Sequence, residues 1–555
     1  MPLRPAIPPS RALLLGAALA VAVPCAAARA QGCDSVASRT TLAALSGRPI
    51  GALRVVTAAP DPFPGLAARL AGLHVRTRES TVRRELLLAA GDTVDTLRVA
   101  ESLRRLRRLR YLTDAEMIGV RCGGPASPVT LTVVTRDGWS VKPTVQMRTA
   151  SAALALTERN LLGTGREATV ALRSDRGRTG LGTELRDPAP FGGPVAAAVG
   201  ANTYRDGQDW YAEVARGTPS LADRWSYEAA VRRSARTPVA DGGAAPATLG
   251  VSFERARVTA LVGRRLRASD VAVTALQGGV EYERAGLAAA PGMPRVGSAR
   301  VRRELAALDV GVRRRSVAFD TLTWLLPGDG IVDVPRSLEF DVLSGVGRES
   351  VTGGPVVHLD AWAGRLWRPD ARSLLAADLW TSGYRTADRW SAGTLRGAVA
   401  WRHAAARGLW TARADGEWLF DPDPDLRAMV SADPTAAALP REQRLAQGVL
   451  ALSLEREVRL RPLSRSWALD GAAFVAASSR WDPAALGDGG VERLGVGVAG
   501  VGLRLAPTRL GRATARLDLG LPVLRGPGVR GRPFLSISIS PSLEQGRHRD
   551  GRDGR

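Results

Sequence analysis

From Val141 onward, apolar and polar residues of the chain alternate with a period of two. In residues 450–461, leucine and valine alternate with serine, glutamate and arginine, and similar patterns recur in 512–521 and 535–540. Segments of about ten residues with one apolar and one polar face have the length that a tilted strand needs to cross a membrane. Because backbone groups cannot stay unpaired in lipid, such strands must close into a barrel. We therefore predict a transmembrane antiparallel β-barrel over residues 137–541.

A soluble β-sandwich or propeller is the alternative interpretation of this alternation. It predicts more β-branched and aromatic residues, packed in a dry core, and fewer charges on the second face of each strand. The many arginines and acidic residues on that face favour the membrane barrel.

The region before the barrel follows a mixed pattern. Ile50–Val56 has the pattern of a strand, and Ser80–Ala90 that of a helix capped by Ser80 or Thr81. Asp95 is predicted to start a second helix, and two alternating strands follow at Tyr111–Val120 and Val129–Thr135. The order strand, helix, helix, strand, strand predicts a small α+β domain over residues 48–136.

The second of these helices has a predicted inner and outer face. We expect Leu97, Ala100, Leu103 and Leu106 to point inward and the four arginines between Arg104 and Arg108 to point outward. Such an arginine run is more typical of a solvated helix face than of a binding patch.

Two glycine-containing motifs mark the change from the mixed pattern to the alternating one. The first is Asn160-Leu161-Leu162-Gly163-Thr164-Gly165, and the second contains Asp187-Pro188. A dinucleotide fingerprint requires a strand that leads into a helix. Strand-like alternation follows the first motif, as it also follows the glycine pairs at 345–347 and 495–500. We therefore interpret all of them as turns or kinks of a sheet, and we expect no nucleotide or other cofactor.

The motifs on both sides of this change resemble those of a known family. Leu87-x-x-x-Gly91-Asp92 and the leucines from Leu103 to Leu112 are similar to a POTRA domain, the polypeptide-transport-associated module. The turn at Asn160–Gly165 and the Asp187-Pro188 turn resemble the first hairpins of the bacterial surface-antigen family of outer-membrane barrels, the BamA/TamA type. The resemblance covers roughly residues 48 to 541.

This resemblance implies a fold, a location and a function. The fold is a mostly β protein, an antiparallel transmembrane barrel of about 16 strands after one POTRA-like domain in the periplasm. The function is to assist the insertion or translocation of polypeptides at the outer membrane, without enzymatic activity. The expected partners are outer-membrane lipids, unfolded outer-membrane or secreted polypeptides, and periplasmic proteins. A passive or plugged channel without assembly activity is the alternative.

One family signature departs from its usual place. The lumen loop of such barrels carries Val-Arg-Gly followed by Phe or Tyr, well before the final strands. The close match here, Val529-Arg530-Gly531-Arg532, directly precedes the predicted last strand. We therefore assign no loop role to Arg530.

The two ends of the chain are predicted to lie outside both domains. Arg4 and Arg11 precede the apolar run Ala12–Val23, and Ala28-Arg29-Ala30 offers a cleavage site. These features predict an exported chain with a signal peptide at 1–30. An N-terminal segment then spans 31–47, and a polar tail spans 542–555.

The charge is strongly positive, at +23, and Lys142 is the only lysine. Nucleic-acid binding would require a basic patch with interleaved aromatic residues. The arginines are instead spread along strands and loops, so we expect no nucleic-acid partner. Arginines lining a polar lumen or facing anionic lipid headgroups explain the charge equally well.

Two cysteines, Cys33 and Cys122, remain after the predicted cleavage. In an oxidising export compartment they would pair, with a gain of roughly 4–5 kcal/mol in the chain-entropy model. Two separate free thiols are the alternative.

The chain lacks the sequence marks of a metal site or a hydrolase. The 4 histidines are scattered, and no Cys or His pair has metal-ligand spacing. His358 and His403 lie in the barrel region, and Asp360 shares a strand face with His358. Since no serine is marked as their partner, we interpret His358 as part of a polar network in the lumen. We therefore expect neither a metal site nor catalytic residues.

Overall fold

A computed structural model describes most of the chain. The described residues are 33–37, 42–59, 74–109, 111–122, 127–138, 140–148, 151–175, 178–204, 207–217, 223–236, 251–289, 301–325, 332–349, 353–386, 390–421, 428–429, 445–464, 467–482, 492–507, 513–526 and 531–541. The predicted signal peptide, the predicted polar tail, Val529 and Arg530 lie outside them.

The chain divides into two compact units. The smaller unit takes its described residues from Met1–Pro60 and Arg76–Asp137, and the larger one from Asp61–Val75 and Gly138–Arg555.

The described residues of the smaller unit form a four-stranded sheet, two α-helices and one short 3₁₀ helix. Its strands are β1 (Cys33–Ala37), β2 (Ile50–Ala58), β3 (Leu112–Cys122) and β4 (Val129–Asp137), and its helices are η1 (Leu42–Leu45), α3 (Glu79–Arg84) and α4 (Thr96–Arg108). The sheet order is β1-β3-β4-β2; β2 pairs with β4 in parallel, and the other pairs are antiparallel. From β2 onward, the elements follow the predicted order. Strand β1, from the segment 31–47, adds an edge to this sheet.

The core of the smaller unit lies between the helices and one face of the sheet. It contains 15 buried apolar residues, among them Leu106 on α4 and Leu131 and Val133 on β4. Strand β4 alternates between buried and half-buried positions along most of its length, as a sheet covered on one face should.

The helices differ from the prediction in length and in inner face. Helix α3 ends at Arg84 instead of near Ala90, whereas Asp95 caps α4 as predicted, accepting a hydrogen bond from Leu97 N at 2.8 Å. Leu103 and Leu106 are buried, but Leu97 is 48% exposed.

The buried face of α4 is rotated slightly from the predicted inner face. Val99, Leu103 and Leu106 are buried and fall on one face of the helix. Ala100 is exposed. Arg104, predicted to point outward, is buried and forms an ion pair with Glu101, one turn earlier on the same helix.

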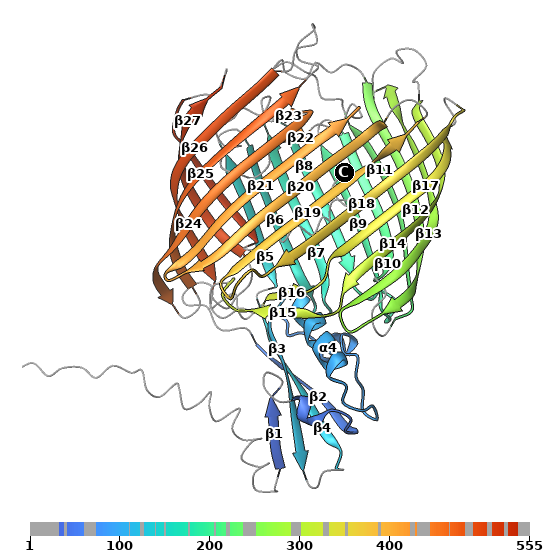
Figure 1. Ribbon diagram of the computed structural model, residues 1–555, viewed down its shortest axis with the longest axis vertical. Helices are drawn as coiled ribbons and strands as arrows, with labels where there is room; N and C mark the ends of the chain where they lie inside the picture. Colours follow the sequence, from blue (N-terminus) through green and yellow to red (C-terminus); the bar gives the residue numbers. More distant parts are fainter. Residues whose placement is uncertain are drawn as a thin grey trace, which may run out of the picture. The chain divides into compact units, whose positions relative to one another are not determined.

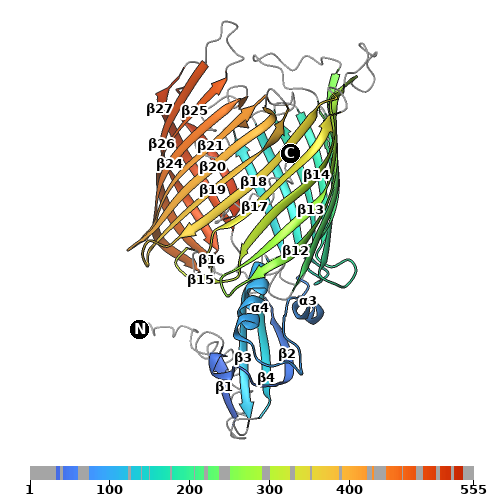
Figure 2. The same ribbon diagram turned by 45° about the vertical axis from the view of Figure 1, so that its right-hand side comes forward.

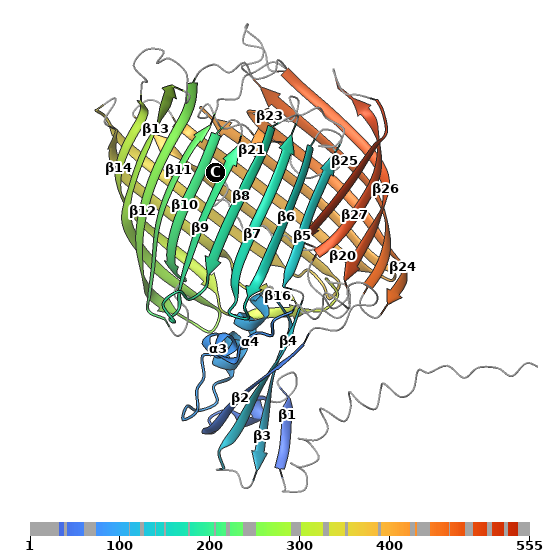
Figure 3. The same ribbon diagram turned by 180° about the vertical axis from the view of Figure 1, so that it is seen from behind.

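The larger unit is an antiparallel sheet of 20 strands curled into a barrel (Figures 1 and 3). Its strands, in chain order, are β5 (Val141–Arg148), β6 (Ser151–Leu161), β7 (Arg166–Asp175), β8 (Arg178–Asp187), β9 (Val195–Tyr204), β10 (Gly207–Arg216), β11 (Trp225–Arg236), β12 (Val251–Ala268), β13 (Ala272–Ala289), β14 (Val301–Ser316), β17 (Glu339–Glu349), β18 (Pro355–Trp367), β19 (Ser373–Arg385), β20 (Trp390–Ala405), β21 (Gly408–Phe420), β24 (Gly448–Ser464), β25 (Trp467–Asp482), β26 (Glu492–Pro507), β27 (Ala513–Arg525) and β28 (Phe534–Pro541). Each strand pairs with its neighbours in this order, as the rotated view in Figure 2 shows for β12, β13, β14 and β17.

The prediction of about 16 strands is therefore too low. The count is too low because the first strands and many of the turns are shorter than the prediction assumed. Strands β5 to β10 contain 8 to 11 residues each, and the turn between β20 and β21 contains two. More strands fit into the same length of chain than the prediction assumed.

The first and last strands of this sheet meet along a very short pairing. Strand β28 pairs with β5 at Ile537↔Met147 and Ser538↔Gln146. By contrast, β27 pairs with β28 at eight positions, from Ala513↔Pro541 to Gly520↔Phe534. The β5–β28 junction is thus held by fewer backbone hydrogen bonds than its neighbour, and we call it the seam.

Two short hairpins complete the larger unit. Strands β15 (Phe319–Leu322) and β16 (Val332–Pro335) pair with each other, as do β22 (Ala428–Met429) and β23 (Leu445–Ala446). The β15–β16 hairpin has a small apolar core that includes Leu322, Val332 and Leu374 of β19.

The barrel wall buries charge and exposes apolar side chains. On β14, Arg303, Asp309 and Arg313 are buried. Leu308 and Val310, between them in sequence, are 68% and 59% exposed. This distribution is the reverse of that in a soluble sheet, where one face is dry and the exposed face is polar. No helix among the described residues is long and apolar enough to cross a membrane.

Candidate functional site

A polar cavity lies inside the barrel. Its volume is about 400 Å³, and its lining comes from strands between β7 and β20. The side chains that line it and carry charge or a polar ring include Arg257, Glu281, Glu283, Arg303, Asp309, His358 and Tyr384. The interior of this part of the barrel is therefore a charged, hydrogen-bonding environment rather than an apolar core.

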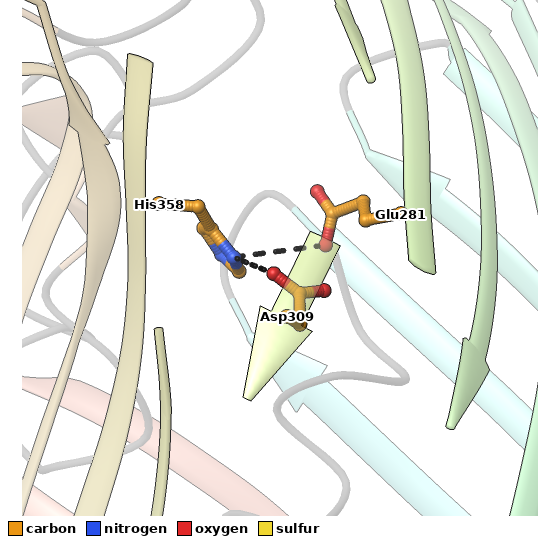
Figure 4. A group of neighbouring side chains, drawn as sticks. All are labelled: Glu281, Asp309 and His358. Atoms are coloured by element: carbon orange, nitrogen blue, oxygen red, sulfur yellow. Dashed lines mark hydrogen bonds and ion pairs between the residues drawn. The ribbon is translucent and has the colours of Figure 1, made fainter. Parts of the chain in front are cut away.

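Three of these side chains converge from three strands. Glu281 lies on β13, Asp309 on β14 and His358 on β18, and Figure 4 shows them pointing toward one another. His358 Nδ1 lies 3.5 Å from Asp309 Oδ1 and 3.9 Å from Glu281 Oε2. All three residues are buried. We call this group the interior triad.

The strand register explains how Asp309 reaches His358. Strand β17 lies between β14 and β18, and its Gly345 is directly opposite Asp309 on one side and His358 on the other. A Cβ atom at position 345 would come within 1.9 Å of Asp309 Oδ1. The missing side chain leaves the space in which the carboxylate and the imidazole meet across β17.

Neighbouring groups fix the orientation of the triad. The Tyr384 hydroxyl donates to Glu281 Oε1 and to Glu283 Oε2, each at 2.9 Å. The Tyr384 ring stacks on the His358 ring, with centroids 5.2 Å apart. Arg257 Nη2 donates to Glu281 Oε2 at 2.6 Å. These contacts hold the imidazole and one carboxylate in place.

Asp309 differs from several other buried acids of the barrel. Glu283 pairs with Arg303. Elsewhere, Arg504, itself 1% exposed, pairs with Glu455 and Asp518. Among the described residues, the contact of Asp309 with a basic group is the 3.5 Å approach to His358. A buried carboxylate without an arginine needs another source of positive charge or hydrogen bonds.

The sequence prediction found one member of this group. His358 was expected in a polar network of the lumen, and the structure places it in one. The expected neighbour Asp360 is also buried, but the contacts of the His358 ring are with Asp309 and Glu281. The other barrel histidine, His403, contacts Ser373 Oγ through Nδ1 at 2.9 Å, away from the triad.

Glu281 and Asp309 were missed because nothing in one sequence shows which strands become neighbours. Each is one of many acidic residues on the polar faces of strands. The available signal was the glycine pair at 345–347 within a strand, since glycine there marks a close approach of another group.

The motif at Asn160–Gly165 forms the β6–β7 turn. Leu162, Gly163 and Gly165 all have positive φ. Positive φ favours glycine, and glycine occupies two of these three positions. The Asn160 side chain, 2% exposed, accepts a hydrogen bond from Gly165 N at 2.8 Å. Leu161 O accepts from the Thr164 hydroxyl at 2.7 Å. The interpretation of this motif as a turn agrees with these contacts.

The Asp187-Pro188 turn is joined to the first. Asp187 Oδ1 accepts from Ala189 N at 2.9 Å, which closes its own turn, and Oδ2 accepts from Arg166 Nε at 2.7 Å. Arg166 is the first residue of β7, directly after the Asn160–Gly165 turn. The family-like residues therefore brace two adjacent turns of the sheet.

Cys33 and Cys122 both lie in the smaller unit. Cys33 on β1 is directly opposite Cys122 on β3. Residues in such positions have Cβ atoms about 4.5–5.5 Å apart, near the range that a disulfide needs. The disulfide itself stays a prediction.

The smaller sheet has one long edge strand. Strand β2 lies at the edge, whereas β3 lies between β1 and β4. Arg83 Nη2 of α3 donates to Leu53 O at 2.9 Å, so this carbonyl points away from β4. The backbone N–H and C=O groups of successive residues point to opposite sides of a strand. Those of Val55, two residues after Leu53, therefore point to the same edge as the Leu53 carbonyl.

Comparisons with known proteins give distant structural likenesses. No family model matches the chain, and no curated protein matches it. CdiB from Escherichia coli aligns with a TM-score of 0.44 and 11% identity over 92% of this chain and 81% of that chain. BamA from Haemophilus ducreyi lacking POTRA domains 1–3 aligns with a TM-score of 0.32 and 11% identity over 88% and 84%. Likenesses with such low TM-scores and identities carry no conclusion about this chain.

Proposed function

We propose that this chain is an outer-membrane β-barrel that assists the insertion or translocation of polypeptides. The proposal joins two features, a barrel wall suited to lipid and a separate small unit with an exposed strand edge. The periplasm is the compartment we assign to the smaller, POTRA-like unit.

The wall supports the membrane location. Leu308 and Val310 of β14 belong to a large set of exposed leucines and valines on the barrel strands, while charges such as Asp309 are buried. In water this arrangement would expose a large apolar surface and would favour aggregation. In a bilayer it places apolar side chains in lipid and charges in the lumen.

The position of β2 at the edge of its sheet is the observation that best supports a role in handling polypeptides. An exposed edge offers unpaired backbone groups to which an extended polypeptide can add as a further strand. The sequence-independent nature of backbone pairing suits a module that accepts many different chains. The short pairing at the seam is consistent with a barrel that opens there to pass a strand into the membrane.

The proposal is tested with the purified full-length chain in liposomes. We expect it to accelerate the folding of a urea-denatured outer-membrane protein, followed by heat-dependent gel mobility. Val55→Pro removes an edge N–H group and should lower this acceleration several-fold, while Val55→Ala, the matched control, keeps the N–H and should not.

The alternative, a passive channel, predicts a different result. A large steady conductance in planar bilayers, together with no acceleration of client folding, would reject the assembly role and support the channel. Recovery of the chain as a soluble periplasmic protein would reject both.

A further inference from the structure

We infer that the interior triad, Glu281, Asp309 and His358, is a binding site for a divalent transition-metal cation, with Zn²⁺ as the representative ion. This inference goes beyond the proposed function and does not depend on it. The ligand atoms would be one imidazole nitrogen and two carboxylate oxygens, which all lie within 4.8 Å of one another.

The chemistry of the donors selects the class of metal. Carboxylates alone suit Mg²⁺ or Ca²⁺, whereas an imidazole among them favours zinc and its neighbours in the first transition row. Three protein ligands leave a fourth position for water, and the adjoining cavity has room for it. The triad therefore resembles an open, three-ligand site rather than a closed structural one.

The two distances from His358 require only a small contraction. Ligand atoms about 2.0–2.1 Å from a tetrahedral zinc ion lie roughly 3.4 Å from each other. His358 Nδ1 is 3.5 Å from Asp309 Oδ1 and 3.9 Å from Glu281 Oε2. Contractions of at most about half an ångström would bring these two distances to that value, and the Glu281 and Asp309 oxygens lie within 4.8 Å of each other.

The charge of the site supports a cation independently of the distances. Arg257 contacts Glu281, and Arg303 contacts Glu283, whereas within the described part of the chain the basic contact of the buried Asp309 is His358. This imidazole at 3.5 Å compensates the buried carboxylate less than the arginines compensate Glu281 and Glu283. A divalent ion would balance it and would take the place of the missing arginine.

The groups around the triad resemble the outer shell of a metal site. In such sites, hydrogen bonds and stacking fix the ligand orientation, and their loss weakens binding about 10- to 100-fold. Tyr384 is such an outer-shell residue, because its hydroxyl donates to Glu281 and its ring stacks on His358. Gly345 leaves the space in which Asp309 Oδ1 lies.

The test uses the full chain without a polyhistidine tag, refolded in detergent with chelator and then dialysed. Calorimetric titration with Zn²⁺ and metal analysis give the stoichiometry, and Co²⁺ titration gives a visible spectrum that reports nitrogen and oxygen ligands. We expect one equivalent of Zn²⁺ per chain. His403→Gln, a matched change at the other barrel histidine, should bind normally.

Ligand variants should lose this site. Asp309→Asn and His358→Gln should weaken Zn²⁺ binding at least about 100-fold, and Tyr384→Phe about 10-fold. Each variant is first checked for the heat-dependent gel shift of a folded barrel. A wild-type chain that binds no Zn²⁺, or folded Asp309→Asn and His358→Gln chains that bind it as the wild type does, would overturn the inference. In that case the triad is a metal-free polar network of the wall.

Discussion

The Asp309 carboxylate approaches the His358 imidazole to 3.5 Å across an intervening strand, β17. Two strands so separated lie roughly 10 Å apart, so their side chains meet only where the middle strand leaves space. Gly345 supplies that space. The contact is thus determined by a residue that takes no direct part in it.

The first prediction concerns this glycine. A methyl group at position 345 would overlap Asp309 Oδ1 and would come within 2.9 Å of Leu308 O. We expect Gly345→Ala to destabilise the barrel by about 1–3 kcal/mol, as overpacking does. The temperature at which the folded gel band disappears should fall.

Gly278→Ala is the control for this experiment, because the nearest atom to its added methyl, Asp309 O, is an ordinary 3.8 Å away. Equal effects of the two substitutions would contradict the role assigned to Gly345.

A second prediction concerns the end of β4. Asp137 is buried and accepts hydrogen bonds from Thr77 N at 2.9 Å and from Thr77 Oγ1 at 2.7 Å. Removing the carboxylate breaks both buried hydrogen bonds, so Asp137→Ala should cost the smaller unit about 2–3 kcal/mol in urea unfolding. Glu79→Ala, which removes an exposed ion pair with Arg83, should cost less than about 0.5 kcal/mol. A similar loss for both variants would argue against this anchor.

Alkaline pH should destabilise the smaller unit through Tyr111. Burial, and next the charge of Glu85, raises the pKa of Tyr111 above its ordinary value of about 10. The stability that the neutral phenol contributes is therefore fully present below pH ~10 and is lost as the pH rises toward the folded-state pKa. Tyr111→Phe should remove this dependence.

The Tyr111 hydroxyl lacks a hydrogen-bond partner among the described residues, so the phenylalanine variant should be about as stable at pH 7. The measurement is the urea midpoint of residues 31–137 between pH 7 and 11. If the two proteins weaken in parallel above pH 10, other groups cause the loss.

The cysteine register gives a fourth prediction. Because Cys33 and Cys122 are directly opposite, we expect a disulfide between them in a chain that has been exported and has lost the predicted signal peptide, which contains Cys25. Alkylation after denaturation, followed by mass measurement, should add no group without reductant and two groups with it. The Cys33→Ser, Cys122→Ser double variant should add none in either case. Two added groups without reductant would show free thiols.

The sequence was sufficient for local features and insufficient for long-range ones. The alternation of residues such as Leu308, Asp309 and Val310 reveals a strand and its two faces, because side-chain direction repeats every two residues. The cap at Asp95 and the turn at Asn160–Gly165 are equally local. The sequence did not reveal that the β20–β21 turn contains only two residues, and so it underestimated the strand count.

The interior triad could not be predicted for a different reason. Its members come from strands whose pairing depends on the register of the whole sheet, and a shift by one residue would turn each side chain to the other face. On α4 a smaller error of the same kind occurred, since the predicted face included Leu97, which is exposed, and assigned Arg104 to solvent. The ion pair with Glu101 offsets part of the cost of burying that arginine.

The last prediction separates a membrane barrel from a soluble one. Leu308 is 68% exposed on the outer face of β14. In water, an arginine there would be neutral or would improve solubility. On a lipid-facing surface, Leu308→Arg should cost up to about 2–4 kcal/mol, depending on depth, and should reduce the amount of folded barrel in membranes.

Leu308→Ala keeps the position apolar and should assemble nearly normally in the same cells. The measurement is the ratio of heat-shifted to unshifted protein in the membrane fraction. An arginine variant that assembles as well as the alanine variant would mean that this face is not in lipid. The outward leucines and valines of the barrel would then need a protein partner to cover them.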